Sequence, residues 1–230
     1  MIERGVPPAQ AFSPGWYGKM PAAGDFIARR LSASFSEPWD RWLQGAMAGS
    51  RERLGERWQD AFLCMPAWRF VLGPGVVSRN AWAGLMVPSV DSVGRYFPLT
   101  VASALPPQAL DTVATLLAAT PWFEDIEAIA LSALTPGADP AAIDAGIMRR
   151  PFRSTWLQPP PGSDATVPAG APVPKLRWAA PGLSETRGAW LTEASELFER
   201  CLLSCEVLPA AEQYCAMMDA RWVEHGWSGH

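Results

Sequence analysis

The segment 88–100, PSVDSVGRYFPLT, constrains the fold of this 230-residue chain more than any other part of the sequence. It places Asp91 and Arg95 close together between two apolar runs, with a proline at each end and Gly94 inside. Proline and glycine restrict turns to few conformations, and a guanidinium can bind a nearby carboxylate in a fixed geometry. The segment therefore predicts a rigid polar loop between two buried strands, a place where function is commonly found.

Two further polar segments lie upstream, GKMPAAGDF at Gly18–Phe26 and WDRWL at Trp39–Leu43. The first resembles the 88–100 loop because it also carries one base and one acid in a glycine-containing turn after an apolar run. We expect Lys19 to pair with Asp25, as Asp91 pairs with Arg95 in the other loop. We also expect both loops to meet in space, at the ends of neighbouring strands.

The polar loops contain side chains that a catalytic site could use. Three hydroxyls could act as nucleophiles: Ser89, Ser92 and Thr100. Asp25 or Asp91 could serve as a base, but two carboxylates fall short of a magnesium or manganese site. The only histidines are His225 and His230, in a C-terminal stretch where we expect no fixed geometry. A structural role for the ion pairs is therefore favoured over catalysis.

Neither glycine-base pair of the loops fits a nucleotide site. Gly18 with Lys19 and Gly94 with Arg95 match neither a Walker loop nor a dinucleotide-binding turn. No cofactor or metal is expected. The net charge is −4, and the basic residues are scattered singly or in pairs, such as Arg29 with Arg30 and Arg149 with Arg150. The absence of a basic stripe makes nucleic acid an unexpected partner.

The sequence also indicates the compartment of the protein and the redox state of its cysteines. The N-terminus has no secretory signal, and the apolar stretch Val113–Leu134 is interrupted by proline and acidic residues, so we expect a cytoplasmic protein without a membrane span. The four cysteines form no C-x-x-C pair and have no histidine near them: Cys64, Cys201, Cys205 and Cys215. We expect four free thiols.

Hydrophobic periodicity gives the expected elements. Apolar runs bounded by glycine or proline predict strands at 16–20, 26–31, 68–72, 81–87, 97–105, 176–179, 189–191 and 201–207. Apolar residues at helical spacing predict helices at 36–58, 111–134, 140–150 and 209–222. Strands and helices alternate only in part, which favours an α/β fold with a mixed, partly antiparallel sheet and helices packed on both faces, a three-layer sandwich.

The ends of the helices have recognisable signals. Ser36 is a plausible N-cap for the first helix, which we expect to break near Gly49. Pro121 divides the second helix, with Thr120 as the cap of its second half, and Asp139 caps the third.

The chain is expected to form a single domain over 15–224, after a mobile lead at 1–14 and before a C-terminal tail at 225–230. A Pro-rich loop interrupts it at 158–175. Most of the twelve tryptophans should face the core, and some exposed ones could form a recognition surface together with arginines near the loops.

Taken in order and spacing, GKMPAAGDF, WDRWL, WRF at 68–70 and PSVDSVGRYFPLT resemble the type VI secretion-associated TagF family. The resemblance implies a cytoplasmic accessory factor that represses type VI secretion after translation, by preventing assembly of the contractile apparatus. It also implies a link to the forkhead-associated scaffold protein and the threonine phosphorylation pathway. The positions that match the family's motifs are Lys19, Gly24, Asp25, Ser89, Asp91, Gly94 and Arg95.

Two hypotheses therefore arise. The favoured one is a non-enzymatic repressor that acts by protein–protein interaction, with the scaffold protein as its partner. The alternative is a small hydrolase or ligand-sensing domain that uses the loop of Ser89, Asp91 and Arg95. The missing histidine argues against the hydrolase.

Overall fold

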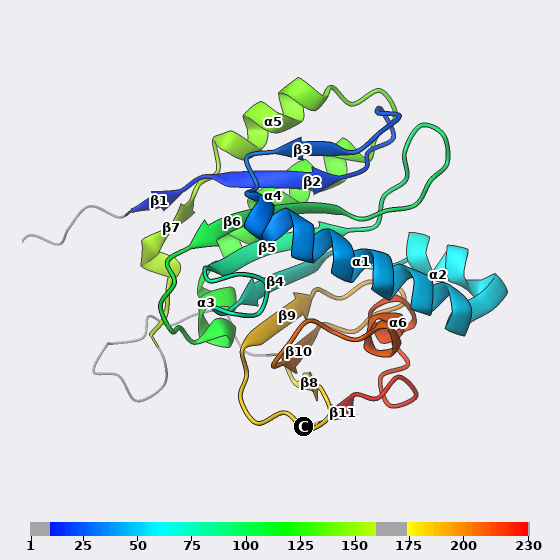
Figure 1. Cartoon of the computed structure of the whole chain (residues 1–230), viewed down its shortest axis with the longest axis vertical. Coiled ribbons are helices and arrows are strands. Elements are labelled where there is room, and N and C mark those ends of the chain that lie inside the picture. The colour runs from blue at the N-terminus through cyan, green and yellow to red at the C-terminus, as the bar shows by residue number, and fades with distance from the viewer. Residues whose placement is uncertain (1–9, 160–173, 230) are drawn as a thin grey trace, which may run out of the picture.

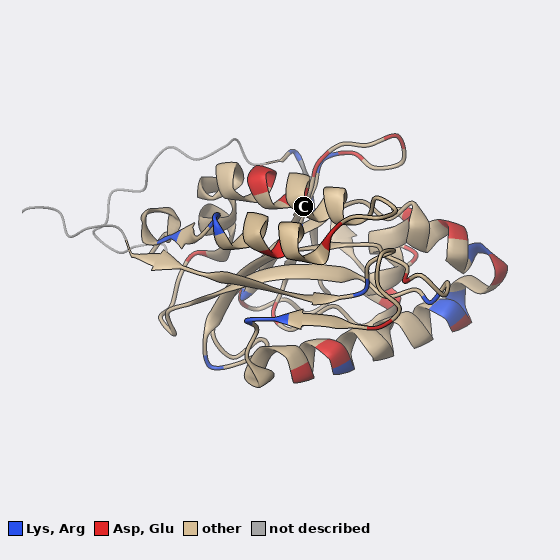
Figure 2. Cartoon of the chain, turned by 90° about the horizontal axis from the view of Figure 1, so that it is seen from above, with Lys and Arg blue, Asp and Glu red and all other residues tan. Residues whose placement is uncertain are grey.

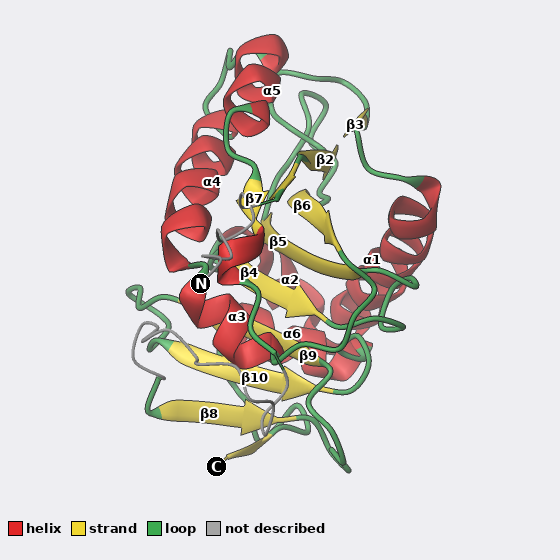
Figure 3. Cartoon of the chain, turned by 90° about the vertical axis from the view of Figure 1, so that its left-hand side faces the viewer, coloured by secondary structure: helices red, strands yellow, loops and turns green. Residues whose placement is uncertain are grey.

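The central strands carry mostly apolar side chains on both faces, so the sheet that they form is covered on both sides. In β4 (Trp68–Leu72) every residue is buried, and successive side chains point to opposite faces. Phe70 packs in one hydrophobic core and Val71 in the other. The computed structural model describes residues 10–159 and 174–229 and shows helices on both faces of this sheet (Figures 1 and 3).

The main sheet has nine strands in the order β11-β8-β10-β9-β4-β5-β6-β2-β3. All neighbours are antiparallel except β8 and β10, which are parallel. A separate two-stranded sheet joins β1 and β7. The strands besides β4 are β1 (Ala11–Phe12), β2 (Pro14–Gly18), β3 (Ile27–Arg29), β5 (Ala81–Val87), β6 (Leu99–Leu105), β7 (Phe152–Arg153), β8 (Leu176–Ala179), β9 (Gly188–Thr192), β10 (Cys201–Cys205) and β11 (Ser228–Gly229). The predicted mixed, partly antiparallel sheet is confirmed.

Two sets of helices cover the sheet. One face carries α1 (Ala33–Leu54), α2 (Trp58–Leu63) and α6 (Ala211–Asp219), with a short 3-10 turn between α1 and α2. The other face carries α3 (Thr112–Ala118), α4 (Thr120–Ala133) and α5 (Pro140–Met148). Figure 3 shows both layers beside the strands, and Figure 2 shows acidic and basic residues interspersed along α1 and α2. The predicted three-layer arrangement is confirmed.

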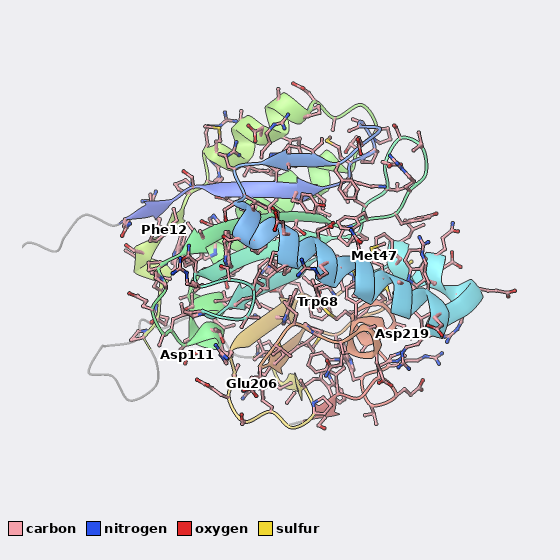
Figure 4. The ribbon with its side chains drawn as sticks, in the orientation of Figure 1. Phe12, Met47, Trp68, Asp111, Glu206 and Asp219 are labelled. Atoms are coloured by element: carbon pink, nitrogen blue, oxygen red, sulfur yellow. The ribbon has the colours of Figure 1, made fainter. Side chains whose placement is uncertain are left out.

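The core under α1 and α6 is built from tryptophans. Trp39 lies within stacking distance of Phe70 and Trp190, with ring centroids 4.9 and 6.1 Å away. Trp68 donates its Nε1 proton to the carbonyl of Met217 in α6, at 3.0 Å. Figure 4 labels Trp68 behind α1, on which Met47 lies. Trp39 and Trp68 each satisfy their Nε1 proton with one hydrogen bond, which lowers the cost of burying their indole rings.

Helix α1 differs from its predicted course. It begins at Ala33, with Ser32 as N-cap, rather than after Ser36. The earlier start places Phe35 in the helix, where its side chain is fully buried. The predicted break near Gly49 is wrong, because the helix continues to Leu54. A Cβ on Gly49 would lie 2.6 Å from the Cβ of Ala211, so the glycine permits the close approach of α6.

The other helix ends agree more closely with the sequence. The predicted division at Pro121 separates α3 from α4, but the N-cap of α4 is Ala119, whereas the Thr120 hydroxyl donates to the carbonyl of Leu117 at 2.8 Å. Asp139 caps α5 as predicted, because its carboxylate accepts from two backbone N–H groups of the first turn.

Residues near both ends of the described part of the chain take part in the fold. Of the expected lead, residues 10–14 contribute β1 and the start of β2, whereas residues 1–9 lie outside the described residues. Of the expected tail, Trp227 is buried and donates its Nε1 proton to the carbonyl of Gln213, and β11 pairs with β8. Residues 160–173 of the Pro-rich loop and His230 also lie outside the described residues.

The expectation of exposed tryptophans is wrong. All twelve indole rings are buried or half-buried. The exposed large apolar side chains near the polar loops are Phe26 and Val93. All four cysteines are free thiols, of which only Cys64 is exposed. Among the described helices, none has the length and apolar character needed to cross a membrane.

Candidate functional site

The two polar loops lie side by side, as predicted. Strand β2 ends at Gly18 next to the start of β6, because the two strands pair antiparallel. The Ser89 hydroxyl donates to the carbonyl of Lys19 at 2.7 Å, and the Ser92 amide donates to the carbonyl of Ala23 at 3.1 Å. The guanidinium of Arg95 donates to the carbonyl of Gly24. The paired loops are therefore one structural unit.

Asp91 is the centre of this unit. Its side chain has no exposed surface, and one carboxylate oxygen accepts from the backbone amides of Val93 and Arg95 at 3.1 and 2.8 Å. The other oxygen accepts from Arg95 Nε at 2.7 Å and contacts Lys19 Nζ at 2.9 Å. Burial by itself would raise the pKa of this carboxyl, but these donors hold the pKa well below its usual range. A carboxylate with all its acceptor sites occupied is a poor general base.

Lys19 does not pair with Asp25, and that prediction is wrong. The Lys19 side chain is nearly fully buried and binds Asp91 in the neighbouring loop, with the Phe26 ring 5.1 Å from its ammonium group. Asp25 is exposed, and its carboxylate accepts from the amide of Phe26 at 2.8 Å. A buried carboxylate requires a nearby cation far more than an exposed one does, which explains why Lys19 turns to Asp91.

The remaining motif residues shape the loops. Gly94 has a φ of 83°, a left-handed conformation that favours glycine, and its amide donates to the carbonyl of Asp91 to close the turn. Gly24 contributes its carbonyl to Arg95. Val93, at the tip of the turn, is 67% exposed, so the loop presents an apolar side chain on a rigid frame.

The WDRWL segment joins the same unit through α1, a link that the sequence reading missed. Trp39 Nε1 donates to the hydroxyl of Thr100 at 3.0 Å. The Tyr17 hydroxyl donates to the Asp40 carboxylate at 2.6 Å, and burial together with that carboxylate raises the pKa of Tyr17. The sequence contains one usable signal, because Asp40 directly follows the buried Trp39.

The chemistry available at this unit is limited. Neither loop contains a histidine. The expectation that His225 has no fixed geometry is wrong, because its Nε2 lies 3.1 Å from an Asp219 carboxylate oxygen. Asp219 ends α6 (Figure 4) and His225 precedes β11, at the opposite edge of the sheet from β3. Within residues 10–159 and 174–229 no three His, Cys, Asp or Glu side chains gather as a metal site would require.

Comparison with known proteins places the three segments in a common family. The model of the TagF N-terminal domain, described as type VI secretion system-associated, matches residues 15–149, which include all three. The chain belongs to the TagF family. Its role is therefore associated with type VI secretion. No curated protein sequence matches the chain.

A solved structure extends the TagF comparison beyond residue 149. The chain is similar to PA0076 from Pseudomonas aeruginosa PAO1, whose crystal structure is known: the sequence identity is 32% and the TM-score is 0.68. The match covers 91% of this TagF-family chain and 95% of that one. The resemblance drawn from the sequence motifs is confirmed, and the fold after Arg150 also has a counterpart in that structure.

Proposed function

We propose that this TagF-family chain is a cytoplasmic, non-enzymatic repressor of type VI secretion that acts after translation by binding a protein partner. The observation that carries the proposal is the family match over 15–149, which contains both polar loops and the whole of α1. The partner that we propose is the forkhead-associated scaffold protein of the secretion system. Binding of that scaffold would withhold it from assembly of the contractile apparatus.

The geometry of the loops supports binding rather than catalysis. The carboxylate of Asp91 is enclosed by four donors, and the Ser89 hydroxyl is engaged by the carbonyl of Lys19. A hydrolase would need a free base beside the hydroxyl, and the acceptor sites of Asp91 are already occupied. No specific observation favours the hydrolase or ligand-sensing alternative.

Dose dependence separates a binding repressor from an enzyme. The chain is produced at graded levels in a bacterium that lacks its own copy, and secretion and contractile sheath assembly are measured. A repressor that sequesters its partner acts in proportion to its amount, so raising the level of the scaffold protein should restore secretion. Pull-down of the scaffold with the tagged chain should succeed from the same cells. Full repression far below the scaffold's concentration, without capture, would contradict the proposal.

A pair of serine variants tests the alternative directly. Ser89→Ala removes the buried hydroxyl that donates to the carbonyl of Lys19. Ser103→Ala is the matched control, because Ser103 is also buried and its hydroxyl also donates to a backbone carbonyl, that of Phe12 at 3.0 Å. Each variant should lose about 1 kcal/mol of stability and still repress. Loss of repression by the first alone, at equal stability, would favour the hydrolase.

A further inference from the structure

A hollow of about 170 Å³ lies between the start of α4 and the segment that follows α5. Three arginines and one aspartate supply its charge: Arg149, Arg150, Arg153 and Asp125. Trp122 and Trp156 provide apolar walls. The Arg149–Arg150 pair was visible in the sequence, but Arg153 and the two tryptophans join it only in the fold. The polar loops play no part in this hollow.

The charges around the hollow do not cancel. Arg150 Nε lies 2.9 Å from an Asp125 carboxylate oxygen, so these two residues neutralise each other. Arg149 and Arg153 are exposed, and in the described part of the chain neither guanidinium has an ion-pair partner. Two unpaired positive charges beside one hollow contrast with the net charge of −4 for the whole chain. The hollow therefore favours an anion.

The backbone that carries these arginines is held in place. Trp122 Nε1 donates to the carbonyl of Arg150 at 2.8 Å. Phe152 is fully buried between Trp122 and Trp156, with ring centroids 5.1 and 5.2 Å away. Strand β7, which includes Arg153, pairs with β1. The backbone is therefore already ordered, and a ligand has to order only the arginine side chains.

Size and chemistry together define the occupant. Guanidinium groups bind carboxylate and phosphate oxygens through paired hydrogen bonds. Sites for whole small molecules usually measure about 300–1,000 Å³, so this smaller hollow suits one side-chain head group. We infer that it is the docking site for an acidic side chain, carrying a carboxylate or a phosphate, in a peptide segment of the protein partner. This inference rests on the proposed function, because it assumes that the chain works by binding a protein.

The test measures peptide binding to the full chain by fluorescence anisotropy at low salt. Two labelled probes are used, a hexaglutamate peptide and a glycine–serine peptide with one phosphoserine, and the unphosphorylated peptide serves as a blank. The double variant Arg149→Gln/Arg153→Gln removes the unpaired charges. The double variant Arg79→Gln/Arg177→Gln is the matched control, because both of its residues are exposed and the net charge changes equally. Circular dichroism confirms that both variants are folded.

We expect at least one acidic probe to bind, and its dissociation constant to rise by roughly tenfold or more in Arg149→Gln/Arg153→Gln but not in the control. The probe that binds identifies the oxyanion as carboxylate or phosphate. Absence of binding to both probes, or equal weakening by the two double variants, would overturn the inference. Binding of an oligonucleotide at the hollow, without binding of either peptide, would also overturn the inference.

The failure of this inference is distinguishable from that of the proposed function. A wild-type chain that represses secretion and captures the scaffold, but binds neither probe, contradicts only the docking site. A wild-type chain that neither represses nor captures the scaffold contradicts the proposed function, whatever the peptides do.

Discussion

The two glycines of α1 provide a sharp test of how this helix packs. Gly45 and Gly49 are one helical turn apart, and the same substitution is proposed at each, Gly45→Ala and Gly49→Ala. A Cβ on Gly45 would meet no atom within 4 Å, whereas one on Gly49 would lie 2.6 Å from the Cβ of Ala211. Both variants gain helix propensity, about 0.8–1 kcal/mol for glycine to alanine. Only Gly49→Ala suffers the steric overlap.

The overlap can be expressed as a free energy of unfolding. Overpacking by one methyl group in a close contact costs about 1–3 kcal/mol. Gly45→Ala should therefore be more stable than the wild type by nearly 1 kcal/mol. Gly49→Ala should range from nearly unchanged to about 2 kcal/mol less stable, since its propensity gain offsets part of the overlap. For a chain of this size the two variants should differ in Tm by roughly 2–12 °C.

The assay is thermal melting followed by circular dichroism, with urea unfolding as a second measure. The double variant Gly49→Ala/Ala211→Gly removes the opposing methyl group, so it should recover about 1–3 kcal/mol relative to the sum of the two single changes. Equal stabilisation by Gly45→Ala and Gly49→Ala, with no coupling to Ala211, would show that α1 and α6 are not in close contact. The explanation of Gly49 as the residue that permits the close approach of α6 would then be refuted.

Other predictions concern the loops and the thiols. Asp91→Ala should lower the Tm more than Arg95→Ala, because it leaves the buried ammonium of Lys19 unpaired, whereas the Arg95 side chain is 54% exposed; equal melting of the two variants would contradict this. The pKa of Asp91 is depressed in the folded chain, so its contribution to stability is complete above the ordinary value of 3.8 and is lost as the pH falls below it. The difference in Tm between wild type and Asp91→Asn should thus shrink below about pH 4, and a constant difference down to pH 2 would be inconsistent with it. In the native chain only Cys64 should react with a thiol reagent, because the other thiols are buried, and all four should react after denaturation under non-reducing conditions. Fewer than four reactive thiols would point to a disulfide.

Much of the fold could be predicted from short-range patterns. The runs 68–72 and 81–87 are bounded by glycine or proline, and they became adjacent antiparallel strands as expected. Asp139 was recognisable as a cap because its carboxylate serves amides only two and three residues away. Such interactions depend on neighbours in the sequence, so the sequence reports them directly.

The site was only partly predictable. Its two loops were found because each combines glycine, an acid and a base, and their meeting follows from the pairing of β2 with β6. The choice of Lys19 between Asp25 and Asp91 could not be read from spacing, because it depends on which carboxylate is buried. The link from Tyr17 to Asp40 likewise joins strand β2 to a helix on one face of the sheet.

By itself, the sequence determined the family, the two-faced sheet and the position of the polar loops, because motifs and periodicity are local properties of the chain. The tertiary structure alone decided that α1 runs past Gly49, that Trp227 is buried, and that Arg149 and Arg153 stand beside one hollow. Each of these depends on a contact between separate elements. Helix α6 packs against α1, Trp227 donates to the carbonyl of Gln213, and α4 lies beside the segment after α5. Burial and close packing are properties of the assembled layers, and no local pattern contains them.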